Sequence, residues 1–225
     1  IFERSINELI MQLSALAQTY RDTPMAGRTH GQQALPITFG FKIAVWLSEM
    51  QRHRERLAQL KARALVGEFG GAVGTLASVG ESGIEINCRL MEELGLGAPD
   101  IAWHTARDRF TEFALAVAMI GATMGKIAHE IIDLQKTEFG EVEEPFEMGK
   151  VGSSTMPQKR NPMLCEAILA LARLTRHQAG TAIDAMMHEH ERDWSSFQME
   201  WSYLPELCIM THGAMVLTLR VVSGL

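Results

Sequence analysis

RDRFTEFALAVAMIGATMGKIAHEIIDLQKT, residues 107–137, is the longest segment of the chain in which apolar side chains recur at helical spacing. The segment contains no proline, so we expect it to form one very long helix. Small residues are spread along it, among them Ala114, Gly121 and Gly125. Small side chains allow neighbouring helix axes to approach closely. The segment therefore predicts a helix that packs tightly against others.

Helical patterns occupy most of the remaining chain. A glycine-rich stretch, residues 67–83, interrupts them, and its glycines do not match the spacing of a dinucleotide-binding loop. We interpret that stretch as a tight corner between helices. Further helices are expected over residues 5–20, after Thr38, over 84–94, over 163–188 and over 205–222.

Local signals refine these boundaries. Ser5 and Glu8 match a capping box at the start of the first helix, and Thr38 is a suitable N-cap for the second. Asn161 and Pro162 suit the first turn of the helix that follows them. The second helix is expected to bury an apolar stripe formed by Phe41, Val45, Leu47, Leu57 and Leu60.

No segment alternates long enough between apolar and polar residues to predict a strand. Residues 22–37 are polar, and their glycines and Pro36 indicate a loop without regular structure. Helices with apolar residues on more than one face are typical of bundles that also pack against other subunits. The fold class is therefore all-α, with residues 1–225 forming one long-helix bundle of an oligomer.

Composition excludes several classes of partner. The formal net charge is −6 and the basic residues are scattered, which argues against nucleic acid or an anionic membrane as the main partner. The longest apolar run, residues 113–125, is shorter than the roughly 18 residues that a membrane span needs. Three cysteines in apolar surroundings indicate buried thiols in a reducing compartment: Cys88, Cys165 and Cys208. We expect a soluble cytoplasmic protein.

The chemistry gathers in GSSTMPQKRNP, residues 152–162. Hydroxyls from Ser153, Ser154 and Thr155 precede two cations, Lys159 and Arg160. Hydroxyl donors, cations, a glycine that allows backbone N–H groups to converge and the start of a helix all favour binding of a carboxylate or phosphate. A solvated surface loop is the plain alternative, and composition does not separate the two.

The order of residues in this loop resembles the signature of the fumarase/aspartase superfamily, Gly-Ser-Ser-x-Met-Pro-x-Lys-x-Asn-Pro, at every specified position. The segments GRTHGQQALPITFG, WHTARDR, TEFGEVEEP and EHERD are similar in order and spacing to the adenylosuccinate lyase and 3-carboxy-cis,cis-muconate cycloisomerase branch. The resemblance covers nearly the whole chain. It implies the central helical domain of a homotetramer, with a histidine loop over residues 22–37, a flexible serine loop over residues 150–162, and N-terminal and C-terminal domains largely outside this sequence.

The resemblance also implies a reaction. Members of the superfamily catalyse β-elimination or addition beside a carboxylate, through a carbanion whose negative charge spreads onto that carboxylate. Ser153 would be the general base, working as an alkoxide. Lys159 and Asn161 would hold the carboxylate on which charge grows, with Ser154 as a positioning donor.

His30, in RTHGQQ, is the candidate acid that protonates the leaving group, because imidazole titrates near neutrality. Thr29 and Gln32 would add hydrogen bonds to the substrate. Arg192, in HERD, matches a position that contacts substrate in the adenylosuccinate branch; the alternative is an ion pair with Glu189 or Asp193. The resemblance implies no metal or cofactor, and an active site assembled from three subunits.

Within this branch, the resemblance of the sequence is divided between two enzymes. Trp103 and Trp201 stand where the adenylosuccinate branch tends to carry Gln and a phosphate-gripping Arg, and an indole cannot replace a bidentate charged contact. We therefore expect a cycloisomerase-like enzyme that lactonises a small polycarboxylate. Adenylosuccinate lyase is the second hypothesis, although His30 fits it better. A catalytically inert, crystallin-like structural protein is the third.

Overall fold

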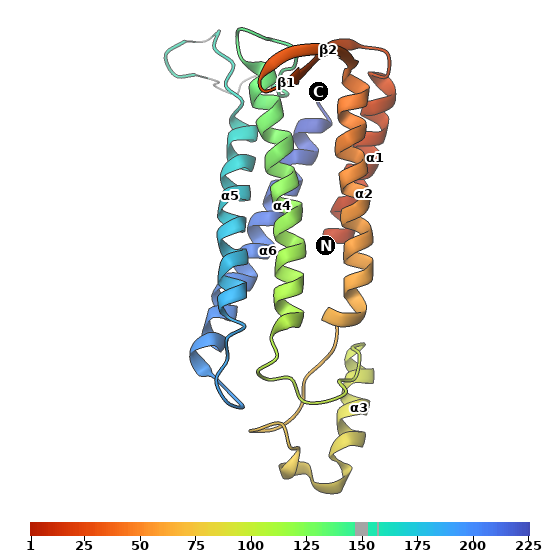
Figure 1. Ribbon diagram of the computed structural model, residues 1–225, viewed down its shortest axis with the longest axis vertical. Coiled ribbons are helices and arrows are strands. Elements are labelled where there is room, and N and C mark those ends of the chain that lie inside the picture. Colours follow the sequence, from red (N-terminus) through yellow and green to blue (C-terminus); the bar gives the residue numbers. More distant parts are fainter. Residues whose placement is uncertain (147–152, 157) are drawn as a thin grey trace. The chain divides into compact units, whose positions relative to one another are not determined.

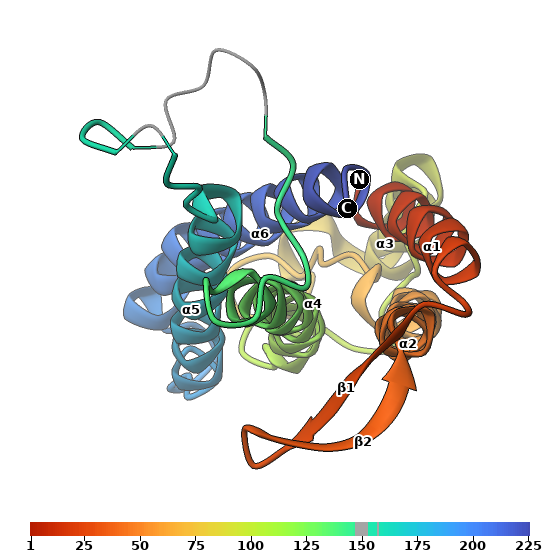
Figure 2. The same cartoon turned by 90° about the horizontal axis from the view of Figure 1, so that it is seen from above.

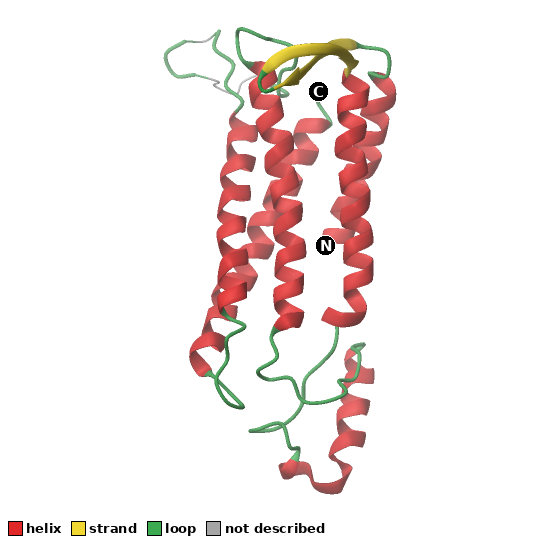
Figure 3. Cartoon of the chain, in the orientation of Figure 1, coloured by secondary structure: helices red, strands yellow, loops and turns green. Residues whose placement is uncertain are grey.

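The computed structural model describes residues 1–146, 153–156 and 158–225. Within them it contains six α-helices, one short 3₁₀ helix and a single antiparallel hairpin, so the predicted all-α class is confirmed (Figures 1 and 3). The elements are α1 (Phe2–Thr19), β1 (Pro24–Thr29), β2 (Gln32–Thr38), α2 (Phe39–Ala64), η1 (Ala77–Ser82), α3 (Gly83–Leu94), α4 (Asp108–Gln135), α5 (Met163–Asp184) and α6 (Trp194–Val222).

The described residues divide into two compact units. Unit 1 comprises Ile1–Glu55, Met119–Arg176 and Ile209–Leu225, and unit 2 comprises Arg56–Ala118 and His177–Cys208. Each unit has a core of its own. Buried side chains of unit 1 include Ile6, Leu9, Leu13, Ile43, Met50, Ile120, Met124, Ile127, Ile131, Ile168 and Met215; those of unit 2 include Leu57, Leu60, Met91, Trp103, Val117, Ala182, Tyr203 and Leu207.

The helices of unit 1 form where apolar residues recur three and four positions apart. In α1, Ile6, Leu9 and Leu13 follow this spacing and are fully buried. Burying one such side chain contributes about 1.5–3 kcal/mol. Packing of this face, more than intrinsic propensity, stabilises a helix of this length. Figures 1 and 2 show α1 beside the first part of α2 within this unit.

Glycines in α4 allow the close helix packing that the sequence predicted. A Cβ atom on Gly125 would lie 2.7 Å from the Cβ of Ala172 in α5, and one on Gly121 would lie 3.2 Å from Thr175. Both separations are too short for a larger side chain without movement of the neighbouring helix. Gly121 and Gly125 therefore fix the spacing of α4 and α5 in unit 1.

The prediction that residues 22–37 lack regular structure is wrong. Residues 24–38 form the β1–β2 hairpin, closed by a two-residue turn at His30 and Gly31 with φ values of 53° and 72°. Positive φ at both central residues is what a type I′ hairpin turn requires. The hairpin was missed because it buries little apolar surface and so lacks a two-residue hydrophobic period. Pro36 lies near a register irregularity and does not prevent the pairing.

Two other predictions about local structure were wrong, and one was confirmed. Ser5 lies inside α1 and its hydroxyl bonds the imidazole of His212 at 3.2 Å, so it is not an N-cap. Phe41 and Val45 are 60% and 44% exposed, because the buried face of α2 is rotated toward Phe39, Ile43, Trp46 and Met50. The Thr38 cap is confirmed by the bond from the Phe41 N–H to its hydroxyl oxygen, 3.1 Å.

Unit 2 contains the glycine-rich corner and α3. Helix α3 ends at Leu94, and Gly95, whose φ is 65°, provides its left-handed C-cap. Helix α6 starts at Trp194 and has Pro205 in its interior, so the predicted start at Pro205 is wrong. Asp193 explains the earlier start: its carboxylate accepts bonds from the Ser195 N–H and hydroxyl and from the Ser196 hydroxyl. These bonds, those of Ser195 first, lower the pKa of Asp193 to about 2.

The cysteines have different environments. Cys165 is fully buried, and desolvation raises the pKa of its thiol. Cys88 is exposed, which contradicts the expectation of three buried thiols, and Cys208 is intermediate. A buried thiol with a raised pKa is a poor nucleophile, so Cys165 contributes packing and not chemistry.

Helices α4 and α6 are long and apolar enough to meet a length-and-composition criterion for membrane spans. In α4, 56% of the apolar window is buried within the protein. Core helices of globular proteins pass the same test. The expectation of a soluble cytoplasmic protein stays a prediction.

Candidate active site

The serine loop is described at Ser153–Met156 and from Gln158 onward, whereas Gly152 and Pro157 lie outside the described residues, as does the rest of the predicted loop start at 150 and 151. The Ser153 hydroxyl oxygen accepts bonds from the backbone N–H groups of Met156, at 3.2 Å, and Thr155, at 3.4 Å. Ser154 is exposed and its hydroxyl lies 3.5 Å from that of Thr155. Two N–H donors aimed at one hydroxyl oxygen stabilise negative charge on it.

Lys159 and Asn161 line a cleft of about 800 Å³ in unit 1. Lys159 is exposed and forms no ion pair within the described part of the chain, so its charge is available to an anion. Arg160 differs: its guanidinium pairs with Glu143 at 3.0 Å and lies 4.2 Å from the ring centroid of Phe146. Of the two loop cations, Lys159 is therefore the one suited to hold a carboxylate.

The first turn of α5 is capped from outside the serine loop. The buried Glu144 carboxylate accepts bonds from the backbone N–H groups of Leu164 and Cys165, each at 3.0 Å. A carboxylate at this position compensates the positive end of the helix dipole. The sequence reasoning assigned that end of the helix to a bound anion, and the structure shows an internal carboxylate there.

His30 lies at the tip of the hairpin with Thr29 and Gln32, and all three side chains are exposed. A non-glycine residue with positive φ carries backbone strain. Figure 2 shows the β1–β2 hairpin and the described part of the serine loop on different sides of α4, within unit 1. Within one chain the structure therefore does not bring His30 to Ser153.

The hairpin is anchored by Arg28. Its guanidinium donates to both carboxylate oxygens of Glu141, at 2.6 and 2.9 Å, and lies 4.6 Å from the ring centroid of Phe139. Gly27 makes room for the strand irregularity, since a Cβ there would lie 2.8 Å from the Leu35 carbonyl oxygen. These contacts hold the base of the hairpin against the 139–141 segment.

Replacing Arg28 by alanine is expected to lower the free energy of unfolding by about 1 kcal/mol at neutral pH, because the pair is partly exposed. The bond from Arg28 lowers the pKa of Glu141. The stabilisation is therefore present above the unfolded Glu pKa, about 4.3, and is lost as the pH falls through the lower folded value. Denaturant unfolding at several pH values measures this, with Arg21→Ala, which breaks an exposed pair with Asp22, as the control. A difference independent of pH would contradict it.

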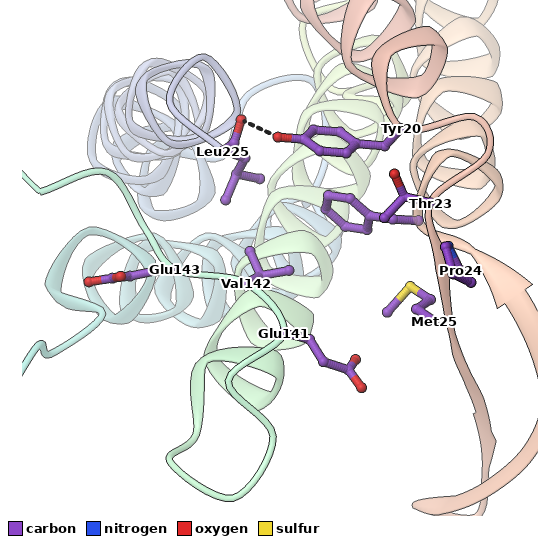
Figure 4. Close-up of a pocket in the computed structure, with 9 residues that line it drawn as sticks. Tyr20, Thr23, Pro24, Met25, Glu141, Val142, Glu143 and Leu225 are labelled. Carbon is purple, nitrogen blue, oxygen red and sulfur yellow. Dashed lines mark hydrogen bonds between the residues drawn. The ribbon is translucent and has the colours of Figure 1, made fainter.

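A pocket beside the hairpin base was not foreseen. It has a volume of about 310 Å³ and is lined by Tyr20, Pro24, Met25, Phe39 and Glu141 among others (Figure 4). The Tyr20 hydroxyl donates to the Leu225 carbonyl oxygen at 3.4 Å. Sequence reasoning had no signal for this pocket, because its walls come from segments far apart in the chain.

Arg192 belongs to unit 2, where it lines a second pocket of about 510 Å³. Its guanidinium donates to the Gly71 carbonyl oxygen at 3.0 Å, and the ion pair with Glu189 or Asp193 that was the alternative reading is not found in the described structure. The pocket walls are largely aromatic: Trp103, Phe110, Trp194 and Phe197.

Two tryptophans bear on the choice between the two enzymes: Trp103, which lines this pocket, and Trp201, which contacts the pocket residue Trp194. Trp103 is buried, and its indole N–H donates to the Gly67 carbonyl oxygen at 2.8 Å. Trp201 is 60% exposed, with its ring centroid 5.4 Å from that of Trp194. Arg107 also lines the pocket, and its guanidinium donates to both carboxylate oxygens of Glu200, at 2.6 and 2.5 Å. Its charge is thus neutralised inside the protein.

Several residues that shape the serine loop carry no sequence signal. Gln135, Glu143 and Glu144 contact the loop stems, and the exposed Glu166 lines the same cleft as Lys159. Their roles depend on contacts between distant segments, so neither spacing nor composition indicates them. Glu143 and Glu144 lie in the segment TEFGEVEEP, whose family resemblance does not by itself indicate these contacts.

Fold and loop together define a helical-bundle protein with a hydroxyl oxygen held by backbone N–H groups and, at a cleft, a lysine that forms no ion pair with the described residues. This arrangement is suited to carboxylate binding and proton transfer. The family model described as a lyase matches residues 1–174. The chain belongs to this lyase family.

Comparison with individual relatives supports the same family assignment. The chain is 45% identical over its whole length to N-acetyl-S-(2-succino)cysteine lyase of Dickeya dadantii, covering 50% of that protein. It is 42% identical to 3-carboxy-cis,cis-muconate cycloisomerase of Pseudomonas aeruginosa and 43% identical to adenylosuccinate lyase of Pyrococcus abyssi, covering all of this chain and 49% and 50% of those proteins. Membership of the predicted superfamily and branch is confirmed.

A solved structure shows the same fold. The 3-carboxy-cis,cis-muconate lactonizing enzyme of Pseudomonas putida superposes with a TM-score of 0.92 at 38% identity, covering 99% of this chain and 49% of that one. The chain spans about half the length of the curated relatives it matches.

Proposed function

We propose that the complete protein catalyses elimination or addition beside a carboxylate of a small polycarboxylate, with proton transfer at carbon by Ser153. The observation that carries this proposal is the Ser153 hydroxyl oxygen, which faces the N–H groups of Thr155 and Met156. The loop leads directly to Lys159 and Asn161 at the cleft. An oxyanion and a carboxylate both need such preorganised donors.

The proposed elimination balances as follows. The Ser153 alkoxide takes the proton from the carbon beside the carboxylate, and the electron pair of that C–H bond forms an aci-carboxylate. Lys159 and Asn161 stabilise its second negative charge, which develops only as the transition state is reached. The pair then forms the C=C bond, while the bond to the leaving group breaks with its electrons and the acid protonates that group. Lactonisation runs these steps in reverse, with an internal carboxylate as the adding group.

His30 is the proposed acid, contributed by another subunit. His30 is exposed at the tip of the hairpin, and the hairpin lies on a different side of α4 from the described part of the serine loop (Figure 2). This supports a site shared between copies in a homotetramer of three-subunit sites. Thr29 and Gln32 would contact substrate from the same turn. Exposed apolar side chains also support self-association; in unit 1 they include Phe41, Leu174, Ile209 and Val216. We place the protein in the cytoplasm and propose no cofactor.

The substrate proposed first is a carboxymuconate-type tricarboxylate, which the protein would lactonise. The fold similarity to the muconate lactonizing enzyme supports it. A second candidate is elimination from N-acetyl-S-(2-succino)cysteine, favoured by the 45% identity to a lyase of that name. For either substrate we propose that Arg192, in the aromatic pocket of unit 2, offers its guanidinium to one carboxylate. A nucleotide phosphate is less well served, since Arg107 is already paired with Glu200.

A substrate panel tests the proposal. The complete protein is mixed separately with carboxymuconate, N-acetyl-S-(2-succino)cysteine and adenylosuccinate, and ultraviolet absorbance follows loss or gain of conjugation. We expect kcat/KM for the best small polycarboxylate to exceed that for adenylosuccinate by at least tenfold, about 1.4 kcal/mol of transition-state binding. A preference for adenylosuccinate would reverse the choice of substrate. Turnover of none of the three would favour an inert structural protein or another substrate.

A further inference from the structure

Both stems of the serine loop are joined by a buried carboxylate. Glu144 precedes the loop, is 6% exposed and receives the N–H groups of Leu164 and Cys165 in the first turn of α5. The first N–H groups of a helix have no partner inside that helix. Hydrogen bonds from backbone N–H groups to a carboxylate are among the stronger ones, and they are directional. Glu144 thereby fixes where α5 begins relative to the segment before the loop.

Gln135, the last residue of α4, makes a second connection between the same stems. Its amide oxygen accepts from the Glu144 backbone N–H at 2.9 Å, and its amide nitrogen donates to the Arg160 carbonyl oxygen at 3.2 Å. One side chain thus contacts the chain before the loop and the chain after it. Both polar atoms of the Gln135 side-chain amide therefore form hydrogen bonds, the oxygen as an acceptor and the nitrogen as a donor.

A third connection involves Arg160 itself. Its guanidinium pairs with Glu143 and lies over the ring of Phe146. The contacts of Glu143, Glu144 and Phe146 thus join the segment 143–146, before the loop, to Arg160 or to the start of α5, after the loop. We call Gln135, Glu143, Glu144 and Arg160 the stem clamp.

The stem clamp surrounds the residues proposed to hold the substrate carboxylate. Arg160 lies between Lys159 and Asn161 in the chain, so immobilising its backbone limits the movement of both neighbours. The Lys159 N–H also donates to the Met156 carbonyl oxygen at 2.9 Å, which continues the order toward Ser153. Misplacement of a substrate-binding group by about 1 Å costs on the order of 100-fold in rate.

We propose that Glu144 and Gln135 are positioning residues for the reaction: the stem clamp sets the location of Lys159 and Asn161. By occupying the N-terminus of α5, Glu144 also leaves Lys159 as the cation on which the substrate carboxylate settles. This inference rests on the proposed function. Neither residue contacts the reacting atoms, so each acts through the loop.

A double-mutant cycle on the complete protein tests it. Glu144→Gln keeps the size of the side chain but removes its charge and replaces one acceptor oxygen with a donor. We expect kcat/KM for the preferred substrate to fall by on the order of 100-fold. In a Lys159→Ala background the same change should cost only a few-fold, because the group that Glu144 positions is gone. Glu138→Gln, which removes a nearby exposed carboxylate, is the matched control and should leave kcat/KM unchanged.

Equal losses from Glu144→Gln in both backgrounds would overturn the inference, because a general structural defect is additive with the loss of Lys159. So would a loss below twofold in the wild-type background. Gln135→Met, which removes both bonds at similar volume, is the second variant should Glu144→Gln fail to fold, and the same non-additivity is expected of it.

Amide hydrogen exchange separates failure of the clamp from failure of the function. Exchange at Leu164 and Cys165 should accelerate in Glu144→Gln and not in Glu138→Gln, whether or not the protein is active. Unchanged exchange would refute the clamp. A wild-type protein that turns over no substrate of the panel, with accelerated exchange in the variant, would refute the proposed reaction and with it the positioning role, while leaving the contacts established.

Discussion

Replacing Ser153 by alanine is expected to lower kcat by roughly 10²–10⁴-fold, the range that a positioned general base contributes. The Ser153 oxygen lies at the N–H groups of Thr155 and Met156, where an alkoxide would be stabilised. KM should change little, because the base acts mainly in the transition state while Lys159 and Asn161 still bind the carboxylate. Steady-state rates of the complete protein with its preferred substrate measure both constants.

The control for this change is Ser14→Ala, on the exposed face of α1. It makes the same chemical replacement outside the candidate site and should leave both constants unaltered. A Ser153→Ala protein with wild-type kcat would remove Ser153 from the reaction. Solvent deuterium exchange into the substrate carbon would then identify whether another base takes the proton.

The second large effect concerns stability. Removing the carboxylate of Glu200 with Glu200→Ala is expected to lower the free energy of unfolding by about 3–5 kcal/mol, because Arg107 would remain as an unpaired buried charge. The pair is bidentate, and the Arg107 guanidinium also lies 4.7 Å from the ring centroid of Phe110. Denaturant unfolding at one fixed protein concentration measures the loss, since self-association would otherwise shift the midpoint.

Two further variants test the cause of that loss. Glu206→Ala removes an exposed carboxylate from the same helix and should change stability by less than about 0.5 kcal/mol. The double replacement Arg107→Met with Glu200→Leu should recover most of the stability, because an apolar pair leaves no buried charge unpaired. A double variant as unstable as Glu200→Ala would mean that the packing of this region, and not the charge, dominates.

The helices were predictable because their signals are local. Periodic apolar residues lie within each helix, and Thr38 marks a helix beginning that the structure reproduces. The hairpin could not be predicted in this way. Its pairing is stabilised by the Arg28–Glu141 ion pair and by backbone hydrogen bonds, and neither leaves a periodic pattern in the sequence. Asp193 shows that a cap can also be overlooked, since it placed the start of α6 well before Pro205.

The candidate site was likewise predictable only in part. Ser153, Lys159, Asn161 and His30 were named from motif order, and their proposed roles await the experiments above. The contacts that hold them were not foreseeable. Glu144 caps a helix that begins beyond the loop, and Gln135 reaches both stems from the end of another helix.

Residue order alone thus specified the helical class, the lyase family and the loop that gathers hydroxyls and a lysine, because each of these is encoded in short spacings along the chain. Folding decided which charges remain available: Arg107 and Arg160 are paired internally, and the start of α5 is occupied by Glu144, which leaves Lys159 without a carboxylate partner in the described structure. The physical reason is that electrostatic interaction depends on separation and burial in space, and residues more than ninety positions apart, such as Arg107 and Glu200, meet only after the chain has folded.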